Sequence, residues 1–231
     1  MMCRFSGLAI GLFSAIAIGA ATTSESPIVI DHEPPVATRI MFDRFHKNPN
    51  MPATQPGEAA LTQSNFECAV SIKYQVMSQH KTGDQWHVMV RIGQAHVHTA
   101  LVDTIYLPQM APVELRAHEE GHRVMNERVY EEGESIAQQA AGKLLDGEWP
   151  GEGKDVDAAG KAATNRAIAK FSDVYLQHTS RRASALGDIY DKLTNHGRNS
   201  LIVANAIKLS FEEERKIAAT QPATTQIDLR P

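Results

Sequence analysis

The segment PVELRAHEEGHRVMNERVYEEGESIAQQAAGKL, residues 112–144, has the periodicity of one long α-helix. Pro112 suits the first turn of a helix, and Glu114 favours its N-terminal end. Side chains of one face then recur at helical spacing. They are Leu115, His118, His122, Met125, Val129, Ile136, Ala140 and Leu144. We therefore predict a helix that begins near Pro112 and ends near Gly147.

Inside this helix, His118-Glu119-Glu120-Gly121-His122 reads HExxH. Residues four apart lie on one helix face, so the two imidazoles can bind a single Zn²⁺. Glu119 would then act as general base toward a zinc-bound water, whose pKa the metal lowers. The plainer alternative is a pair of histidines on an ordinary amphipathic helix. Chance alone produces HExxH in about three of a hundred chains of this length and composition.

The hydrophobic pattern of the rest of the chain predicts strands before this helix and a second helix after it. Period-two alternation covers residues 66–76 and 86–92, with a turn at 81–84, and β-prone residues continue over 96–107. A second long helix is expected from about 156 to 193. These patterns predict an α+β, zincin-like fold in which an N-terminal antiparallel sheet is followed by a long helical hairpin.

A catalytic zinc needs a third protein ligand, and the sequence offers several. Glu134 lies about 18 Å past His122 if the helix is continuous. His96 and His98 share one face of a strand. We favour His196, because the end of the second helix of a hairpin returns toward the start of the first.

Two motifs together resemble a known family. HEEGH follows a strand that ends in Leu107-Pro108, and YDxxTxHG follows some 70 residues later, at 190–197. In this order they resemble an uncharacterised bacterial family of unknown function whose members are labelled secreted zinc-dependent proteases. The resemblance covers about residues 66–199.

The resemblance implies a site assembled from both motifs. It assigns His118, His122 and His196 as zinc ligands and Glu119 as the base. In addition, Tyr190 could donate a hydrogen bond to the developing oxyanion. Asp191 could orient a ligand histidine. The plainer alternative for both is packing and surface charge at a helix end.

The N-terminal residues 1–21 have the features of a secretory signal. Arg4 gives a positive start, an apolar run continues to Ala20, and small residues follow at the predicted cleavage site. A retained membrane anchor is the alternative. Beyond it we expect a loop-rich lead-in over 22–65, with a short strand near 36–42. The metal-binding domain spans 66–199, and a C-terminal helix and loose tail span 200–231.

The charge and cysteine content of the chain limit the classes of partner and of covalent cross-link that we expect. The formal net charge is −4 and no basic block is present, which argues against a nucleic-acid partner. Of the two cysteines, Cys3 lies in the signal, so the mature chain would keep only Cys68 and form no internal disulfide. Cys68 is then a reactive thiol or ligand or, by the plainer interpretation, a small buried hydrophobe in a strand.

The sequence therefore predicts a secreted or periplasmic zinc hydrolase, specifically a metallopeptidase acting on a peptide or protein substrate. No stable membrane anchor remains if the signal is cleaved. The alternative is an exported zinc-binding or envelope-interaction protein on a degenerate zincin fold without turnover, suggested by the surplus of scattered histidines.

Overall fold

The computed structural model describes residues 26–43, 51–52, 59–199 and 201–220. The elements follow one another as β1 (Ile28–His32), β2 (Val36–Phe42), β3 (Leu61–Thr82), β4 (Gln85–Pro108), α1 (Val113–Asp146), β5 (Glu148–Gly153), α2 (Val156–Leu176), the π-helical turn η1 (Gln177–Arg181), α3 (Arg182–Thr194) and α4 (Val203–Thr220). The predicted signal at 1–21 and the end of the tail, 221–231, lie outside the described residues. Among the described helices, none is long and apolar enough to cross a membrane.

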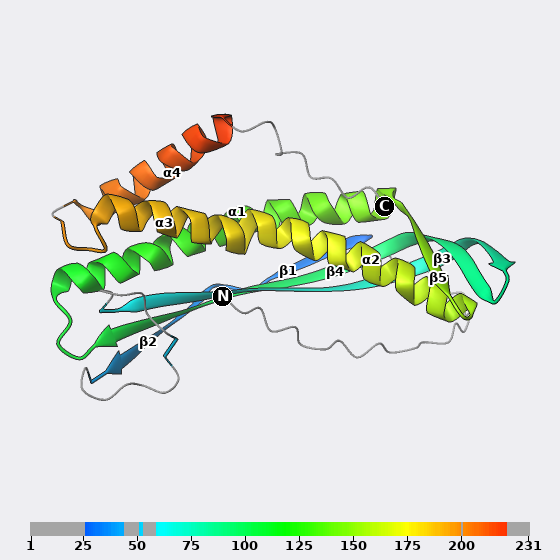
Figure 1. The fold of residues 1–231 in the computed structure, drawn as a ribbon, viewed down its shortest axis with the longest axis horizontal. Helices are drawn as coiled ribbons and strands as arrows, with labels where there is room; N and C mark the ends of the chain where they lie inside the picture. The colour runs from blue at the N-terminus through cyan, green and yellow to red at the C-terminus, as the bar shows by residue number, and fades with distance from the viewer. Residues whose placement is uncertain (1–25, 44–50, 53–58, 200, 221–231) are drawn as a thin grey trace.

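β4 is the central strand of a five-stranded mixed sheet. β3 pairs with it antiparallel along nearly its whole length, through a tight turn in which Gly83 has a φ of 60°. On the other edge of β4, β1 and β2 run parallel to it, and β5 runs antiparallel. β4 therefore has partners on both edges, and β3 is an outer strand (Figure 1).

The predicted N-terminal antiparallel sheet followed by a helical hairpin is wrong. β1 and β2 are parallel to β4, and β5 enters the sheet from between the two long helices. The pairing of two short strands with a distant strand leaves no local signal in the sequence. Residues 36–42 do form a strand, β2, as predicted.

Residues 86–92 and 96–107, which look like separate segments in the sequence, belong to the single strand β4. Buried positions fall on even numbers up to Ile92 and on odd numbers from Ala95 to Ile105. The pairing with β3 skips Gly93, which is the signature of a β-bulge. The extra residue reverses the phase of the alternation, and this reversal made one strand look like two.

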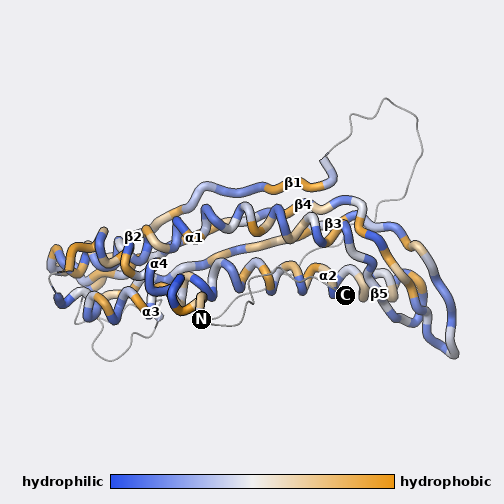
Figure 2. Tube along the Cα trace, turned by 90° about the horizontal axis from the view of Figure 1, so that it is seen from above, coloured by the Kyte–Doolittle hydropathy of each residue, from blue (hydrophilic) through white to orange (hydrophobic). Residues whose placement is uncertain are grey.

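The long helices pack against one face of the sheet. One core cluster combines Val90 and Val97 of β4 with Ala141 of α1 and with Ala163 and Phe171 of α2, all fully buried. Figure 2 shows apolar residues recurring turn by turn along α2, as a helix with one buried face requires. α4 packs outside α1 and α3 (Figure 1). The helices are thereby held against one face of a single sheet.

β5 sets the position of α3 relative to α1. From His122 to the end of α1 is about 36 Å, whereas from the start of α2 to Asp191 is about 52 Å. The six residues of β5 carry the chain about 20 Å further in the direction of α1 before α2 begins. The difference between the two helical paths is thus taken up by β5, and Asp191 returns beside His122.

Candidate metal centre

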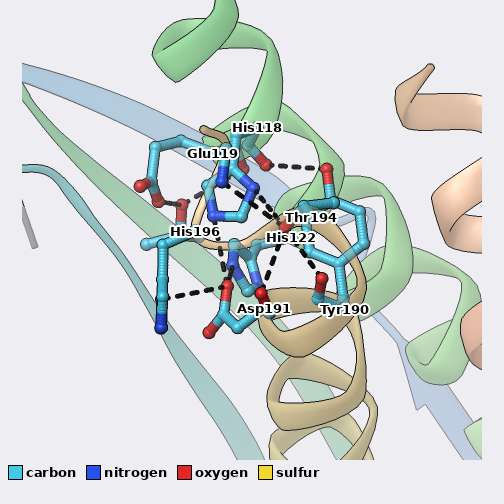
Figure 3. Close-up of polar contacts among 9 residues, drawn as sticks. His118, Glu119, His122, Tyr190, Asp191, Thr194 and His196 are labelled. Carbon is cyan, nitrogen blue, oxygen red and sulfur yellow. Dashed lines mark hydrogen bonds and ion pairs between the residues drawn. The ribbon is translucent and has the colours of Figure 1, made fainter. Parts of the chain in front are cut away.

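Two histidines of α1 and one aspartate of α3 meet at a single point. The Asp191 Oδ1 atom lies 3.1 Å from His118 Nε2 and 3.0 Å from His122 Nε2. The imidazoles are one helical turn apart, with ring centroids 4.9 Å apart and planes nearly perpendicular. Figure 3 shows the carboxylate of α3 facing both rings of α1. The three side chains form a group that could hold a metal ion.

The donor set fits zinc in type and size. Two imidazole nitrogens and one carboxylate oxygen form a ligand set that Zn²⁺ accepts, whereas Mg²⁺ and Ca²⁺ prefer oxygen alone. Ligand atoms of a tetrahedral zinc lie about 3.4 Å apart at bond lengths of about 2.1 Å. The two separations from Asp191 are a few tenths of an ångström shorter, as in hydrogen bonds. A small outward movement of the carboxylate would therefore admit an ion.

The electrostatics keep Asp191 ionised. Burial alone would raise its pKa, but hydrogen bonds from His118 and His122 outweigh burial and hold the pKa well below its usual range. The residue is only 22% exposed. Asp191 is therefore an anion at any ordinary pH, which is the form that a metal ligand requires.

Tyr190 contacts both the ring and the backbone of His118. It is fully buried, its ring stacks on His118 at a centroid distance of 4.9 Å, and its hydroxyl donates to the His118 carbonyl oxygen at 3.3 Å. A Cβ added to Gly121 would lie 2.2 Å from that hydroxyl, so the glycine of HEEGH permits this contact. The predicted role of Tyr190 as an oxyanion donor does not fit, because the hydroxyl is buried against the backbone.

Thr194 and Gly197 complete the support of His118. The Thr194 hydroxyl donates to the Tyr190 carbonyl oxygen at 2.8 Å and lies 3.3 Å from His118 Nδ1. Gly197, at a φ of +72°, lies against His118 so closely that an added Cβ would sit 2.8 Å from the histidine Cβ. Thr194 is the threonine of YDxxTxHG, and its position in that motif did not predict this contact.

His196 lies beside the group without belonging to it. Its Nδ1 atom is 3.9 Å from Asp191 Oδ1, and its side chain is 43% exposed. Asn195, His196 and Gly197 all have positive φ, so the chain turns sharply here. The group that could hold a metal contains Asp191, which the sequence predicted to orient a histidine, and it does not contain His196, the predicted third ligand. His196 lines the adjoining cavity.

Glu119 is buried at the same cavity and has one polar partner from the sheet. Its Oε2 atom accepts a hydrogen bond from Thr62 Oγ1 of β3 at 2.7 Å, and the residue is 4% exposed. Burial raises its pKa, against the opposing influence of His122 and Thr62. The cavity measures about 760 Å³ and is lined by Glu119, the three candidate ligands and His196. Thr62 is a second residue that sequence reasoning missed, and no pattern in the strand marks it.

The neighbouring Glu120 has a different environment. Its carboxylate accepts from Arg39 of β2 at 2.6 Å and from Arg123 at 2.7 Å, and these contacts lower its pKa. It does not line the cavity. Glu120 therefore ties α1 to β2, while Glu119 faces the candidate ligands.

The other candidate ligands lie elsewhere. α1 is continuous, so Glu134 is about 18 Å from His122 along the axis. His98 Nδ1 is 3.0 Å from Asp31, and these two with Glu33 form a second, largely exposed group. His96 is exposed on the same strand, β4.

Cys68 matches the plainer interpretation of its role. It packs against the core from β3, and burial raises the pKa of its thiol to about 12. The thiol is therefore neutral and unreactive at ordinary pH.

Comparison with known proteins adds no relative: no protein-family model, no curated protein and no solved structure matches this chain.

Proposed function

We propose that this chain is a zinc-dependent hydrolase that cleaves peptide bonds. The observation that carries the proposal is the burial of Glu119 at one cavity with His118, His122 and Asp191. When bound there, zinc would supply a Lewis acid that polarises the substrate carbonyl and lowers the pKa of water. His118, His122 and Asp191 would hold it.

Glu119 would move the proton. Its carboxylate takes a proton from the water whose oxygen attacks the carbonyl carbon, and it delivers that proton to the amide nitrogen as the carbon–nitrogen bond breaks. The products are a carboxylic acid and an amine, so all atoms balance. Thr62 keeps the carboxylate in one orientation through its 2.7 Å hydrogen bond.

The first experiment separates metal binding from turnover. Zinc content after purification and zinc affinity by competition titration test the ligands, and hydrolysis of a peptide library tests catalysis. Glu119→Gln should keep zinc and lose about 10²–10⁴-fold in rate. Glu120→Gln is the matched control, because that carboxylate lies outside the cavity. Zinc binding without hydrolysis by the wild type would favour the non-catalytic alternative.

The second experiment identifies the third ligand. Asp191→Ala should weaken zinc affinity by more than about 100-fold, since loss of an orienting partner alone costs about 10–100-fold. His196→Ala should leave the affinity within a few-fold, because Nδ1 lies outside the group. The reverse ranking would return the third position to His196.

We also propose that the chain is exported. The support is the charged start, apolar run and small residues of 1–21. N-terminal sequencing of protein recovered outside the cytoplasm tests this, and a mature N-terminus near Thr22 is expected. An intact N-terminus in a membrane fraction would indicate an anchor instead.

A further inference from the structure

The cavity continues past the candidate ligands along the contact between α1 and α3. Asn126 follows His122 by one turn of α1, and a Cβ added to Gly187 of α3 would lie 3.6 Å from His122 Nδ1. Residues of both helices and of β3 line this extension. We call it the distal groove. It consists of Ser64, Asn126, Ala183, Ser184, Gly187 and Asp188.

The distal groove has room because α3 presents small residues to it. Ala183, Ser184 and Gly187 lie on adjoining turns, and none has a side chain longer than two heavy atoms. On α1, His122 and Asn126 are one turn apart, so the groove extends at least about 5 Å beyond the ligands. The groove therefore has the length to take an extended side chain beside the candidate ligands.

The distal groove carries one charge, the carboxylate of Asp188. Asp188 is exposed, and within the described residues its carboxylate has no hydrogen bond or ion pair. It lies three residues before Asp191 and so shares a helix face with that anion. Among the six groove residues none is a cation. Arg198, which also lines the cavity, comes from the loop beside His118.

The base of the distal groove offers hydrogen-bond acceptors. The Asn126 amide nitrogen donates to Ser64 Oγ at 2.5 Å and to Asp103 Oδ1 at 3.1 Å. Both contacts use the nitrogen, which leaves the amide oxygen as the group that Asn126 can offer to a donor. Asp103 is 1% exposed and its Oδ2 atom has no partner in the described structure. The buried carboxyl group of Asp103 thus contacts Asn126 and Ser64 on the side away from the cavity.

We propose that the distal groove binds the side chain of a lysine or arginine next to the peptide bond that is cleaved. The assignment rests on the proposed function for the peptide nature of the ligand. The aliphatic stem would lie along Ala183 and Gly187, and the cationic end would pair with Asp188. Asp188 is therefore a specificity residue that touches substrate.

Direct binding to the metal-free protein tests the proposal without turnover. The probes are short labelled peptides that are identical except for one central lysine, norleucine or glutamate. The lysine peptide should bind about five-fold more tightly than the norleucine peptide, the range of a partly exposed ion pair, and glutamate should bind weakest. The preference should shrink at about 0.5 M salt. Asp188→Asn should abolish it, whereas Asp157→Asn, an exposed aspartate at the start of α2, should not.

Hydrolysis by the zinc-loaded protein separates this proposal from the proposed function. If the lysine peptide binds preferentially through Asp188 but no peptide is cleaved, the distal groove binds a cationic side chain and the chain is not a peptide hydrolase. If the lysine and norleucine peptides are bound and cleaved equally well, the proposed binding of a cationic side chain is wrong and the proposed hydrolase function is supported. Absence of lysine preference in both assays also overturns it.

Discussion

The Thr194 hydroxyl lies 3.3 Å from Nδ1 of His118 while it donates its own proton to a backbone carbonyl of α3. A carbonyl oxygen can only accept, so the hydroxyl proton points to the carbonyl and Nδ1 of His118 must be the donor. When a metal replaces the proton through which Nε2 bonds to Asp191, the neutral ring keeps its remaining proton on Nδ1 and offers the Nε2 lone pair to the metal. Thr194 therefore selects the tautomer that can bind a metal.

Thr194→Val should accordingly weaken zinc binding by about 10–100-fold, because the ring loses the acceptor that fixes its tautomer and orientation. Competition titration with a chromogenic chelator measures the change. Thr164→Val is the matched control, since that hydroxyl also bonds to a carbonyl of its own helix but lies on α2. Equal zinc affinities of the two variants would show that Thr194 has only a structural role.

The sequence predicted which two segments meet at the candidate metal centre, but not which side chain of the second segment faces His118 and His122. The spacing of HEEGH puts His118 and His122 on one face of any helix, so their proximity followed from periodicity alone. YDxxTxHG was expected at the returning end of the second helix, and Asp191 does lie beside His122. That Asp191 faces the two histidines, while His196 lies outside the candidate group, depends on the backbone, because three successive residues from Asn195 to Gly197 have positive φ.

The strand assignments could not be completed from the sequence for a different reason. Thr62 reaches Glu119 only because β3 pairs with β4 in one register, and that register depends on the bulge at Gly93. Hydrophobic alternation reports which face of a strand is buried, but it does not report its neighbours. The parallel pairing of β1 and β2 with β4 therefore had no local signature.

Gly121 offers a test of the packing between α1 and α3. Gly121→Ala should lower the free energy of unfolding by about 1–3 kcal/mol, because the new Cβ would lie 2.2 Å from the Tyr190 hydroxyl and 3.1 Å from Val203. Urea denaturation measures the loss. Adding Tyr190→Phe removes the nearest atom, so the double variant should be more stable than the sum of the two single changes predicts.

Gly142 supplies the control on the same helix. A Cβ added there meets nothing within 4 Å, so Gly142→Ala should raise the free energy of unfolding by about 0.5–1 kcal/mol through the lower entropy of the unfolded chain. A Gly121→Ala variant as stable as Gly142→Ala would show that the close contact between α1 and Tyr190 does not exist in solution.

Asp103 should make the stability of the protein fall as pH rises. Burial raises its pKa to about 6, against hydrogen bonds from Ser64 and Asn126, whereas the unfolded chain has an aspartate of ordinary pKa. Below about pH 4 both states carry the proton, and the group adds no pH dependence. Between about pH 4 and 6 the unfolded state releases the proton first. The folded state is then penalised by up to about 3 kcal/mol above pH 6.

Asp103→Asn isolates this contribution, because the amide cannot ionise and its oxygen can still accept from Asn126. Urea denaturation at pH values from about 4 to 8 gives the free energy of unfolding of both proteins. The wild-type value minus the variant value should decrease with rising pH and level off above about pH 6. Other titrating groups cancel in this difference, so two parallel curves would show that Asp103 titrates in the folded protein as it does in the unfolded chain.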